Sequence, residues 1–254
     1  MKNLTKNFKN LFYFSFFLLL CVRANAQTNP EITPDFMEKH TFRSMEEALK
    51  NPSDVYSLNL NNTFIEEFPK EILKFTNLRE LNLSGNKMSA IPKEIAKLQN
   101  LTSLNFFGND LVFVAPEIEN LTNLTILNIS YNKLKTIPAE IGKLKKLVEL
   151  NLDNNELTLL PKEIGNLLQL TTLKLGLNQF KDFPKEIVKI SSLESLYLQN
   201  NQLRTLPKEL GKLSKLTLLD LEKNPIKTVP SNLKVFLKNL RYAENENIAS
   251  FFEK

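Results

Sequence analysis

Large apolar residues recur at a fixed interval through most of the chain. The first leucine of an L-x-L or similar triplet returns every 23 residues without an insertion, at Leu58, Leu81, Leu104, Leu127, Leu150, Leu173, Leu196 and Leu219. Apolar and polar residues alternate within each triplet, and a period of two predicts a short strand with one buried face. One repeat cannot bury its apolar face alone, so the period predicts a stack of eight repeats whose strands form a parallel sheet.

An asparagine follows most of the predicted strands. It occurs in seven of the eight repeats, and the first repeat has Thr63 instead: Asn86, Asn109, Asn132, Asn155, Asn178, Asn201 and Asn224. A buried amide at this place can pair with backbone groups of adjacent turns that would otherwise lack partners. We expect the terminal repeat, which has only one neighbouring repeat, to tolerate the weaker Thr63.

The second half of each repeat reads L-P-K-E-I-x-x-L or close to it, as from Leu206 to Leu213. Proline suits the first position of a helical turn, because its missing N–H costs nothing there, and the glutamate favours the positive start of the turn. The pattern predicts a short 3₁₀ or α turn on the convex face. Repeat three departs from it, because Ala115 takes the proline position and Pro116 follows.

Helices are predicted at both ends of the stack. Upstream, Thr33-Pro34 opens one helical segment, and the capping box Ser44-Met45-Glu46-Glu47 opens another that reaches about Asn51. Downstream, Leu233, Phe236, Leu237 and Leu240 have helical spacing, which predicts a final helix to about Tyr242.

Residues 1–26 have the three parts of a secretory signal. A lysine-bearing start is followed by an apolar run from Leu11 to Val22 and by the small-x-small cleavage site Ala24-Asn25-Ala26. The run is shorter than the roughly 20 residues that span a bilayer, so we expect no transmembrane anchor. Cys21 offers lipid anchoring as an alternative, but the large Leu20 before it departs from a strict lipobox.

The pattern divides the chain into four parts: a signal peptide at 1–26, an N-terminal helical cap at 27–54, eight repeats at 55–230, and a C-terminal helical cap and tail at 231–254. We expect an exported protein, either secreted or at the cell surface. Cys21 is the single cysteine, so cleavage after Ala26 would leave a chain without disulfides that depends on packing alone.

Charge and residue inventory argue against nucleic-acid binding and catalysis. Residues 1–26 hold four basic and no acidic residues, and their removal lowers the formal charge from +5 to +1, which leaves little field for a polyanion. His40 is the single histidine, and no phosphate-binding loop motif is present, so we expect no enzyme activity and no cofactor. Glu149 and Asp153 could share a cation with Asn151 or Asn128, but exposed carboxylates are usually solvated, and we expect no metal site.

Two groups of apolar residues are predicted at outward positions, where they would need a partner to cover them. One group lies in repeats three and four and contains Phe107, Ile126 and Tyr131, with Val112 and Phe113 on the adjoining edge. The other lies in repeats six to eight and contains Leu177, Tyr197 and Leu218. Between the strand leucines, a row of five asparagines (Asn59, Asn82, Asn105, Asn128 and Asn151) gives way to Lys174, Tyr197 and Asp220.

These motifs resemble the leucine-rich-repeat family in its 23-residue L-P-K-E-I class, and the chain is similar to secreted spirochaete members. The resemblance spans about Val55 to Leu240. It implies an α/β solenoid, an arc with a concave parallel sheet, short convex turns and helical caps. It also implies binding of host or extracellular proteins of unknown identity through the concave face. The alternative is a structural protein of the cell envelope that associates with itself, for example as a homodimer.

Overall fold

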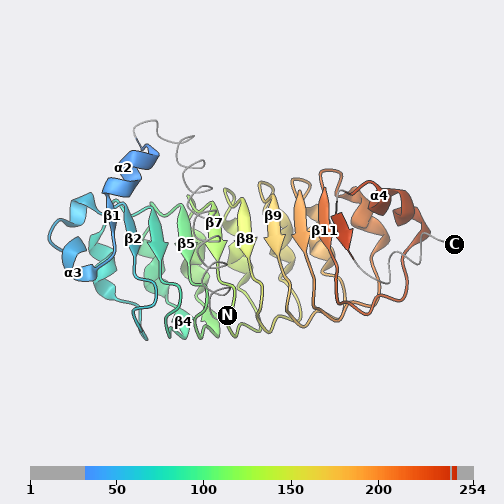
Figure 1. The fold of residues 1–254 in the computed structure, drawn as a ribbon, viewed down its shortest axis with the longest axis horizontal. Helices are drawn as coiled ribbons and strands as arrows, with labels where there is room; N and C mark the ends of the chain where they lie inside the picture. Colours follow the sequence, from blue (N-terminus) through green and yellow to red (C-terminus); the bar gives the residue numbers. More distant parts are fainter. Residues whose placement is uncertain (1–31, 241, 245–254) are drawn as a thin grey trace, which may run out of the picture.

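The computed structural model describes residues 32–240 and 242–244 of the chain. The predicted signal sequence, Cys21 and most of the C-terminal tail, including Phe251 and Phe252, lie outside the described residues. Ten parallel strands stand side by side (Figure 1), in the order β1-β2-β3-β5-β7-β8-β9-β10-β11-β12. The eight strands of the repeats are β2 Ser57–Asn59, β3 Glu80–Asn82, β5 Ser103–Asn105, β7 Ile126–Asn128, β8 Glu149–Asn151, β9 Thr172–Lys174, β10 Ser195–Tyr197 and β11 Leu218–Asp220.

The leucine period sets the register of this sheet. Each leading leucine pairs with the leading leucine of the next repeat, as Leu127 does with Leu104 and Leu150. All eight leading leucines are fully buried or nearly so, and they belong to one continuous apolar core. The predicted fold class is confirmed, because a stack of identical turns buries what a single turn would leave exposed.

The convex side of the stack consists of 3₁₀ turns, which lie behind the sheet in Figure 1. Seven of them have five residues each: η2 Lys70–Lys74, η3 Lys93–Lys97, η4 Pro116–Asn120, η5 Ala139–Lys143, η6 Lys162–Asn166, η7 Lys185–Lys189 and η8 Lys208–Lys212.

The proline of each turn lies one residue earlier than predicted. Pro138 and its equivalents are N-caps with extended backbone, and their carbonyls accept the first hydrogen bond of the turn, from Ile141 N at 3.2 Å in η5. In η4, Ala115 is the N-cap and Pro116 is the first turn residue. The proline of repeat three lies one residue later than in the other repeats, and its 3₁₀ turn still occupies the same positions of the repeat.

The asparagine ladder is present as predicted. Asn132 is 9% exposed, and its Nδ2 donates to the carbonyls of Phe106, Ile129 and Ser130 at 3.0–3.1 Å. Its Oδ1 accepts from Leu111 N at 2.9 Å. One amide thus joins two consecutive turns. In the first repeat, the Thr63 hydroxyl donates only to Leu60 O and to Asn86 Oδ1.

The N-terminal cap contains α2 Pro34–Lys39 and α3 Met45–Ala48, followed by η1 Pro52–Asp54. Thr33 caps α2 and Ser44 caps α3 through their side-chain oxygens. Between the helices, β1 Thr41–Phe42 pairs with β2 and extends the sheet by a strand that the sequence pattern did not predict. His40 is stacked on Phe36 with ring centroids 4.0 Å apart, so the single histidine has a structural role in the cap.

The helix of the C-terminal cap is shorter than predicted. It consists of η9 Ser231–Leu233 and α4 Lys234–Lys238, with Leu233 and Leu237 buried against the last repeat. The prediction of a helix to about Tyr242 is wrong, because β12 Tyr242–Glu244 pairs with β11 instead. An open sheet edge has unpaired backbone groups, and a short added strand pairs them.

A second, two-stranded sheet lies beyond the carboxyl ends of the strands of repeats two and three (Figure 1), where β4 Ala90–Ile91 pairs with β6 Phe113–Val114. No helix within the described residues combines the length and the apolar content that crossing a bilayer requires.

Candidate binding face

The candidate site is the outward face of the ten-stranded sheet, called here the concave face. Strand pairing places the predicted asparagine row in register across β2, β3, β5, β7 and β8, and Lys174, Tyr197 and Asp220 continue it over β9, β10 and β11. Adjacent strands in a sheet are about 4.8 Å apart. The row therefore crosses the face at right angles to the strands, with one side chain per repeat.

The structure brings two residues of the first predicted group together. Phe107 and Tyr131, from adjacent repeats, have ring centroids 4.9 Å apart, and Tyr131 is 47% exposed. We call this pair the aromatic rim, because it lies just beyond the carboxyl ends of β5 and β7. Val112 and Phe113 are exposed, but Phe113 belongs to β6, and among the described residues no ring contact joins it to the aromatic rim. The predicted group is thus divided in two.

Ile126 is a correction to the first group. It occupies an outward position of β7, between Ser103 and Glu149 in register, yet it is only 3% exposed. Ser57, Glu80 and Ser103 in the same row are also buried, so this row is enclosed from β2 to β7. An apolar side chain that is already enclosed leaves no exposed area with which to anchor a partner.

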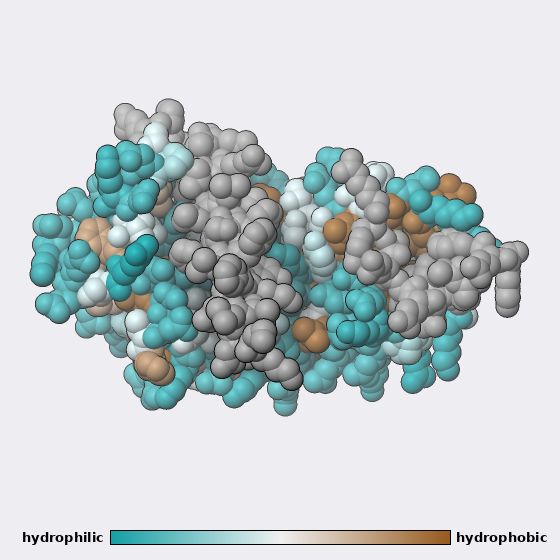
Figure 2. Space-filling model, viewed as in Figure 1, coloured by the Kyte–Doolittle hydropathy of each residue, from teal (hydrophilic) through white to brown (hydrophobic). Residues whose placement is uncertain are grey.

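The second predicted group is spread over β9 to β11. Leu177 is 41% exposed, whereas Tyr197 and Leu218 are half-buried on neighbouring strands. Where the described residues are in view in Figure 2, the surface is largely hydrophilic and the apolar areas there are separate spots.

Backbone conformation marks one position of the repeat that the sequence analysis missed. The fourth residue after each leading leucine has positive φ in all eight repeats: Asn62, Gly85, Gly108, Tyr131, Asn154, Leu177, Asn200 and Lys223. In the first seven repeats its N–H donates to a carbonyl of the next repeat, as Tyr131 N does to Asp153 O at 2.8 Å, so the stack fixes this turn. Glycine and asparagine tolerate positive φ, and their recurrence at this position was the signal that could have revealed it.

Two members of this row are bulky. Tyr131 has φ 56° and Leu177 has φ 54°, and both are exposed. Backbone strain of this kind costs of order 1–3 kcal/mol per residue and concentrates at functional sites. Tyr131 belongs to the first group predicted to bind a partner, and Leu177 belongs to the second.

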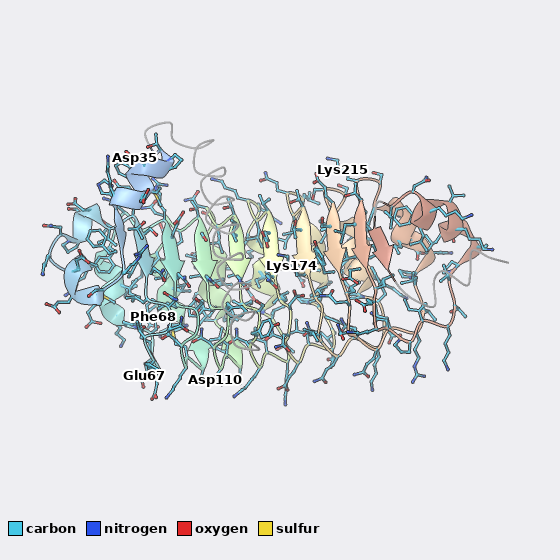
Figure 3. The ribbon with its side chains drawn as sticks, in the orientation of Figure 1. Asp35, Glu67, Phe68, Asp110, Lys174 and Lys215 are labelled. Carbon is cyan, nitrogen blue, oxygen red and sulfur yellow. The ribbon has the colours of Figure 1, made fainter. Side chains whose placement is uncertain are left out.

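An ion pair occupies the middle of the concave face. Lys174, labelled on β9 in Figure 3, places its Nζ 2.7 Å from Glu149 Oε1 on β8, and both side chains are largely buried. Burial opposes the charge of Lys174, but Glu149 and Asp153 raise its pKa above the ordinary value. The Lys174 ammonium thus neutralises Glu149, a carboxylate that the sequence analysis considered for a shared cation.

Two carboxyl groups on the face have raised pKa values. Burial raises the pKa of Asp153 to about 6, against the opposing effects of a hydrogen bond from Gly176 N and of Lys174. Burial likewise raises the pKa of Glu80 to about 7, and the Ser57 side chain partly opposes this shift. Glu80 Oε1 has no partner among the described residues. Burial therefore shifts the titration of both carboxyl groups toward neutral pH.

A stack of 23-residue turns with a parallel sheet on one side, 3₁₀ turns on the other and a buried asparagine ladder between them defines a repeat solenoid. The leucine rich repeat family matches residues 53–111, 116–157 and 168–226, more than half of the chain. The chain belongs to this family, whose members are typically non-enzymatic. No curated protein sequence shows significant similarity to it.

Solved structures of similar fold come from bacteria and plants. A leucine-rich-repeat protein of Leptospira interrogans is 29% identical, with a TM-score of 0.57, over 81% of this chain and 82% of its own. Internalin C2 of Listeria monocytogenes is 24% identical, with a TM-score of 0.68, over 77% of this chain and 83% of its own. The ectodomain of the plant receptor kinase GASSHO1/SCHENGEN3 from Arabidopsis thaliana, in complex with CASPARIAN STRIP INTEGRITY FACTOR 2, is 33% identical with a TM-score of 0.63. That match covers 77% of this chain and 25% of the receptor chain.

Proposed function

We propose that the chain is an exported, non-enzymatic module that binds host or extracellular proteins through its concave face and aromatic rim. The observation that carries this proposal is the pair of bulky apolar residues, Tyr131 and Leu177, held exposed at positive φ where five of the other six repeats have asparagine or glycine and the last has Lys223. Both residues strain the backbone and leave more than two fifths of their surface exposed in the free chain, and contact with a partner would account for both features.

The dimensions of the face favour a macromolecular ligand. Eight strands of repeats about 4.8 Å apart span roughly 34 Å. A broad, mostly polar face of this kind suits a protein better than a small molecule, which binds in a concave, mainly apolar pocket. The plant receptor ectodomain that is 33% identical was solved with a bound factor, and this supports the same class of ligand here.

The experiment that tests the proposal is affinity capture with the mature chain, residues 27–254. Immobilised protein is exposed to serum and to extracellular-matrix extract, and retained proteins are identified by mass spectrometry. The proposal expects a defined protein that is retained by the wild-type chain and lost when the aromatic rim is changed. Retention that survives this change would overturn it.

Self-association is the second candidate function, and the exposed Val112, Phe113 and Leu177 side chains favour it. An apolar spot on one copy can be covered by the same spot on another copy, as in a two-fold symmetric dimer. Light scattering of the purified mature chain separates the two functions, because a binding module stays monomeric without its partner and a self-associating protein does not.

The proposal of export leads to a prediction about processing. Cleavage after Ala26 is expected, because Ala24-Asn25-Ala26 fits the small-x-small rule. Mass spectrometry of the exported protein should find Gln27 as its first residue. A lipid-modified Cys21 at the N-terminus would instead establish the anchored form.

A further inference from the structure

Repeats six to eight carry five basic side chains on one edge of the solenoid, beyond the carboxyl ends of β9, β10 and β11. All five are exposed, and we call them the basic edge: Lys181, Lys185, Arg204, Lys208 and Lys227. Within the three segments that form this edge, 179–185, 202–208 and 225–231, Asp182 is the single acidic residue. Figure 3 shows side chains that project away from the stack along this edge, which lies at the bottom of that view.

The charges of the basic edge are not neutralised by other described residues. In an earlier repeat the same edge does pair its charges, because Lys133 Nζ lies 2.6 Å from Asp110 Oδ1 of the preceding repeat. The residues equivalent to Asp110 in repeats six to eight are neutral: Gln179, Gln202 and Pro225. Among residues 32–240 and 242–244, no ion pair includes a member of the basic edge.

The backbone holds these charges in a row. Lys227 N donates to Arg204 O at 2.8 Å, and Gln202 N donates to Phe180 O at 2.9 Å, so the three segments stack in register. Adjacent segments in such a stack are about 4.8 Å apart. The basic edge therefore runs along the axis of the solenoid, and it suits a ligand whose negative charges also recur along a line.

The near-neutral charge of the mature chain conceals this row. Residues 174–240 contain twelve basic and six acidic residues, whereas residues 32–173 contain fifteen basic and eighteen acidic residues. An anionic polymer responds to the field close to it, which a cluster of like charges raises. The low net charge that argues against a polyanion for the whole chain thus does not apply to repeats six to eight.

The composition of the basic edge selects the class of ligand. Protein interfaces have aromatic or apolar anchors, and single-stranded nucleic acids stack on aromatic side chains. None of the large hydrophobic side chains exposed in the described part of the chain lies in the three segments of this edge. A flat anionic membrane would extend along the same edge to the exposed Glu66 and Glu67 of repeat one, which would repel it. A linear polymer can contact repeats six to eight alone.

We propose that the basic edge binds a linear sulfated polysaccharide, whose sulfate groups pair with the ammonium and guanidinium groups of repeats six to eight. Such binding is driven by the release of counterions, so it needs charges in a line and no apolar pocket, and the sulfate groups supply a high linear charge density. The proposed export favours an extracellular polymer over a nucleic acid. This site goes beyond the proposed function, because it leaves the concave face and the aromatic rim open to a protein.

Heparin, a linear sulfated polysaccharide, is the probe, and biolayer interferometry measures its binding to the mature chain at several salt concentrations. The variant Lys181→Gln, Arg204→Gln, Lys227→Gln removes three charges from exposed side chains, so circular dichroism should show an unchanged fold. Its dissociation constant for heparin is expected to be at least tenfold higher than that of the wild type, with a weaker dependence on salt. Desulfated heparin should bind the wild type at least tenfold more weakly than heparin does.

The matched control is Lys87→Gln, Lys133→Gln, Lys135→Gln, which removes the same charge from the same edge in repeats two and four. Two of these lysines already pair with carboxylates: Lys87 Nζ lies 3.6 Å from Glu66 Oε1, and Lys133 Nζ contacts Asp110. Heparin binding by this variant should be close to that of the wild type.

Equal weakening by the two variants would show that heparin responds to net charge alone, and would overturn the inference. Equal binding of desulfated heparin, or no binding of heparin at physiological salt, would do the same. Duplex DNA, polyglutamate or phosphatidylserine vesicles that bind more strongly than heparin, and lose binding in the basic-edge variant, would assign the edge to that class of partner instead.

The outcome for the basic edge is independent of the outcome for the concave face. The variant Phe107→Ser, Tyr131→Asn, which changes the aromatic rim, should bind heparin as the wild type does. If the mature chain captures no protein but binds heparin through the basic edge, the proposed function fails and this inference stands. If a protein is captured through the aromatic rim and heparin is not bound, the reverse holds.

Discussion

Replacing Asn132 by alanine is expected to lower the free energy of unfolding of the mature chain by about 1–3 kcal/mol. The side chain is buried and makes four hydrogen bonds, all to backbone groups of two consecutive repeats. Alanine would leave the buried Leu111 N–H without a partner, and each of the three carbonyls would lose one of its two hydrogen bonds. Denaturation in urea, followed by circular dichroism, measures the loss.

The matched control for Asn132→Ala is Thr63→Ala in the first repeat. The Thr63 hydroxyl makes only two hydrogen bonds and the residue is exposed, so water can replace its contacts. A smaller loss of stability is expected. Equal losses of stability in the two variants would mean that the hydrogen bonds of the buried asparagines do not hold adjacent repeats together.

The double variant Phe107→Ser, Tyr131→Asn is expected to weaken binding of the captured protein more than tenfold. The two rings are in contact, with centroids 4.9 Å apart and planes tilted by 49°, and they form a partly exposed aromatic anchor of the kind that dominates protein interfaces. Asparagine occupies the equivalent of residue 131 in three other repeats with the same positive φ, so the turn is retained. Biolayer interferometry with the protein that the wild type retains measures the dissociation constant.

Two further variants separate a lost contact from a lost fold. Leu159→Ser removes an exposed apolar side chain at the repeat position equivalent to Phe113, and binding should not change. Leu177→Asn relieves strain at the second bulky residue with positive φ, and the free energy of unfolding should rise by about 1 kcal/mol. If the double variant folds and binds with unchanged affinity, the aromatic rim is ordinary surface.

The sequence alone predicted the parts of the fold that depend on periodicity. The leucine register determined the parallel sheet, and Asn132 and its equivalents were recognisable as buried because one residue type recurred where the chain turns inward. The edge strands β1 and β12 were not predictable in this way. They arise from pairing with the open edges of β2 and β11, a tertiary requirement that leaves no period in the sequence.

The candidate site was predicted only in part. Phe107 and Tyr131 were correctly grouped because they belong to adjacent repeats at the same end of the strands. Ile126 is enclosed at an outward position, so the polarity pattern alone placed it wrongly, whereas Phe113 is exposed as expected but belongs to a separate small sheet. The strain at Tyr131 and Leu177 depends on backbone geometry, which becomes visible only when all eight turns are compared.

Hydrogen–deuterium exchange of the mature chain, with and without the protein that it captures, shows which face of the solenoid the partner covers. Binding through the concave face and aromatic rim predicts slower exchange in segments 103–108 and 126–131, with little change in the convex turns at 139–143 and 162–166. Protection confined to the convex turns, or a mature chain that retains no protein from serum or extracellular matrix, would contradict the account.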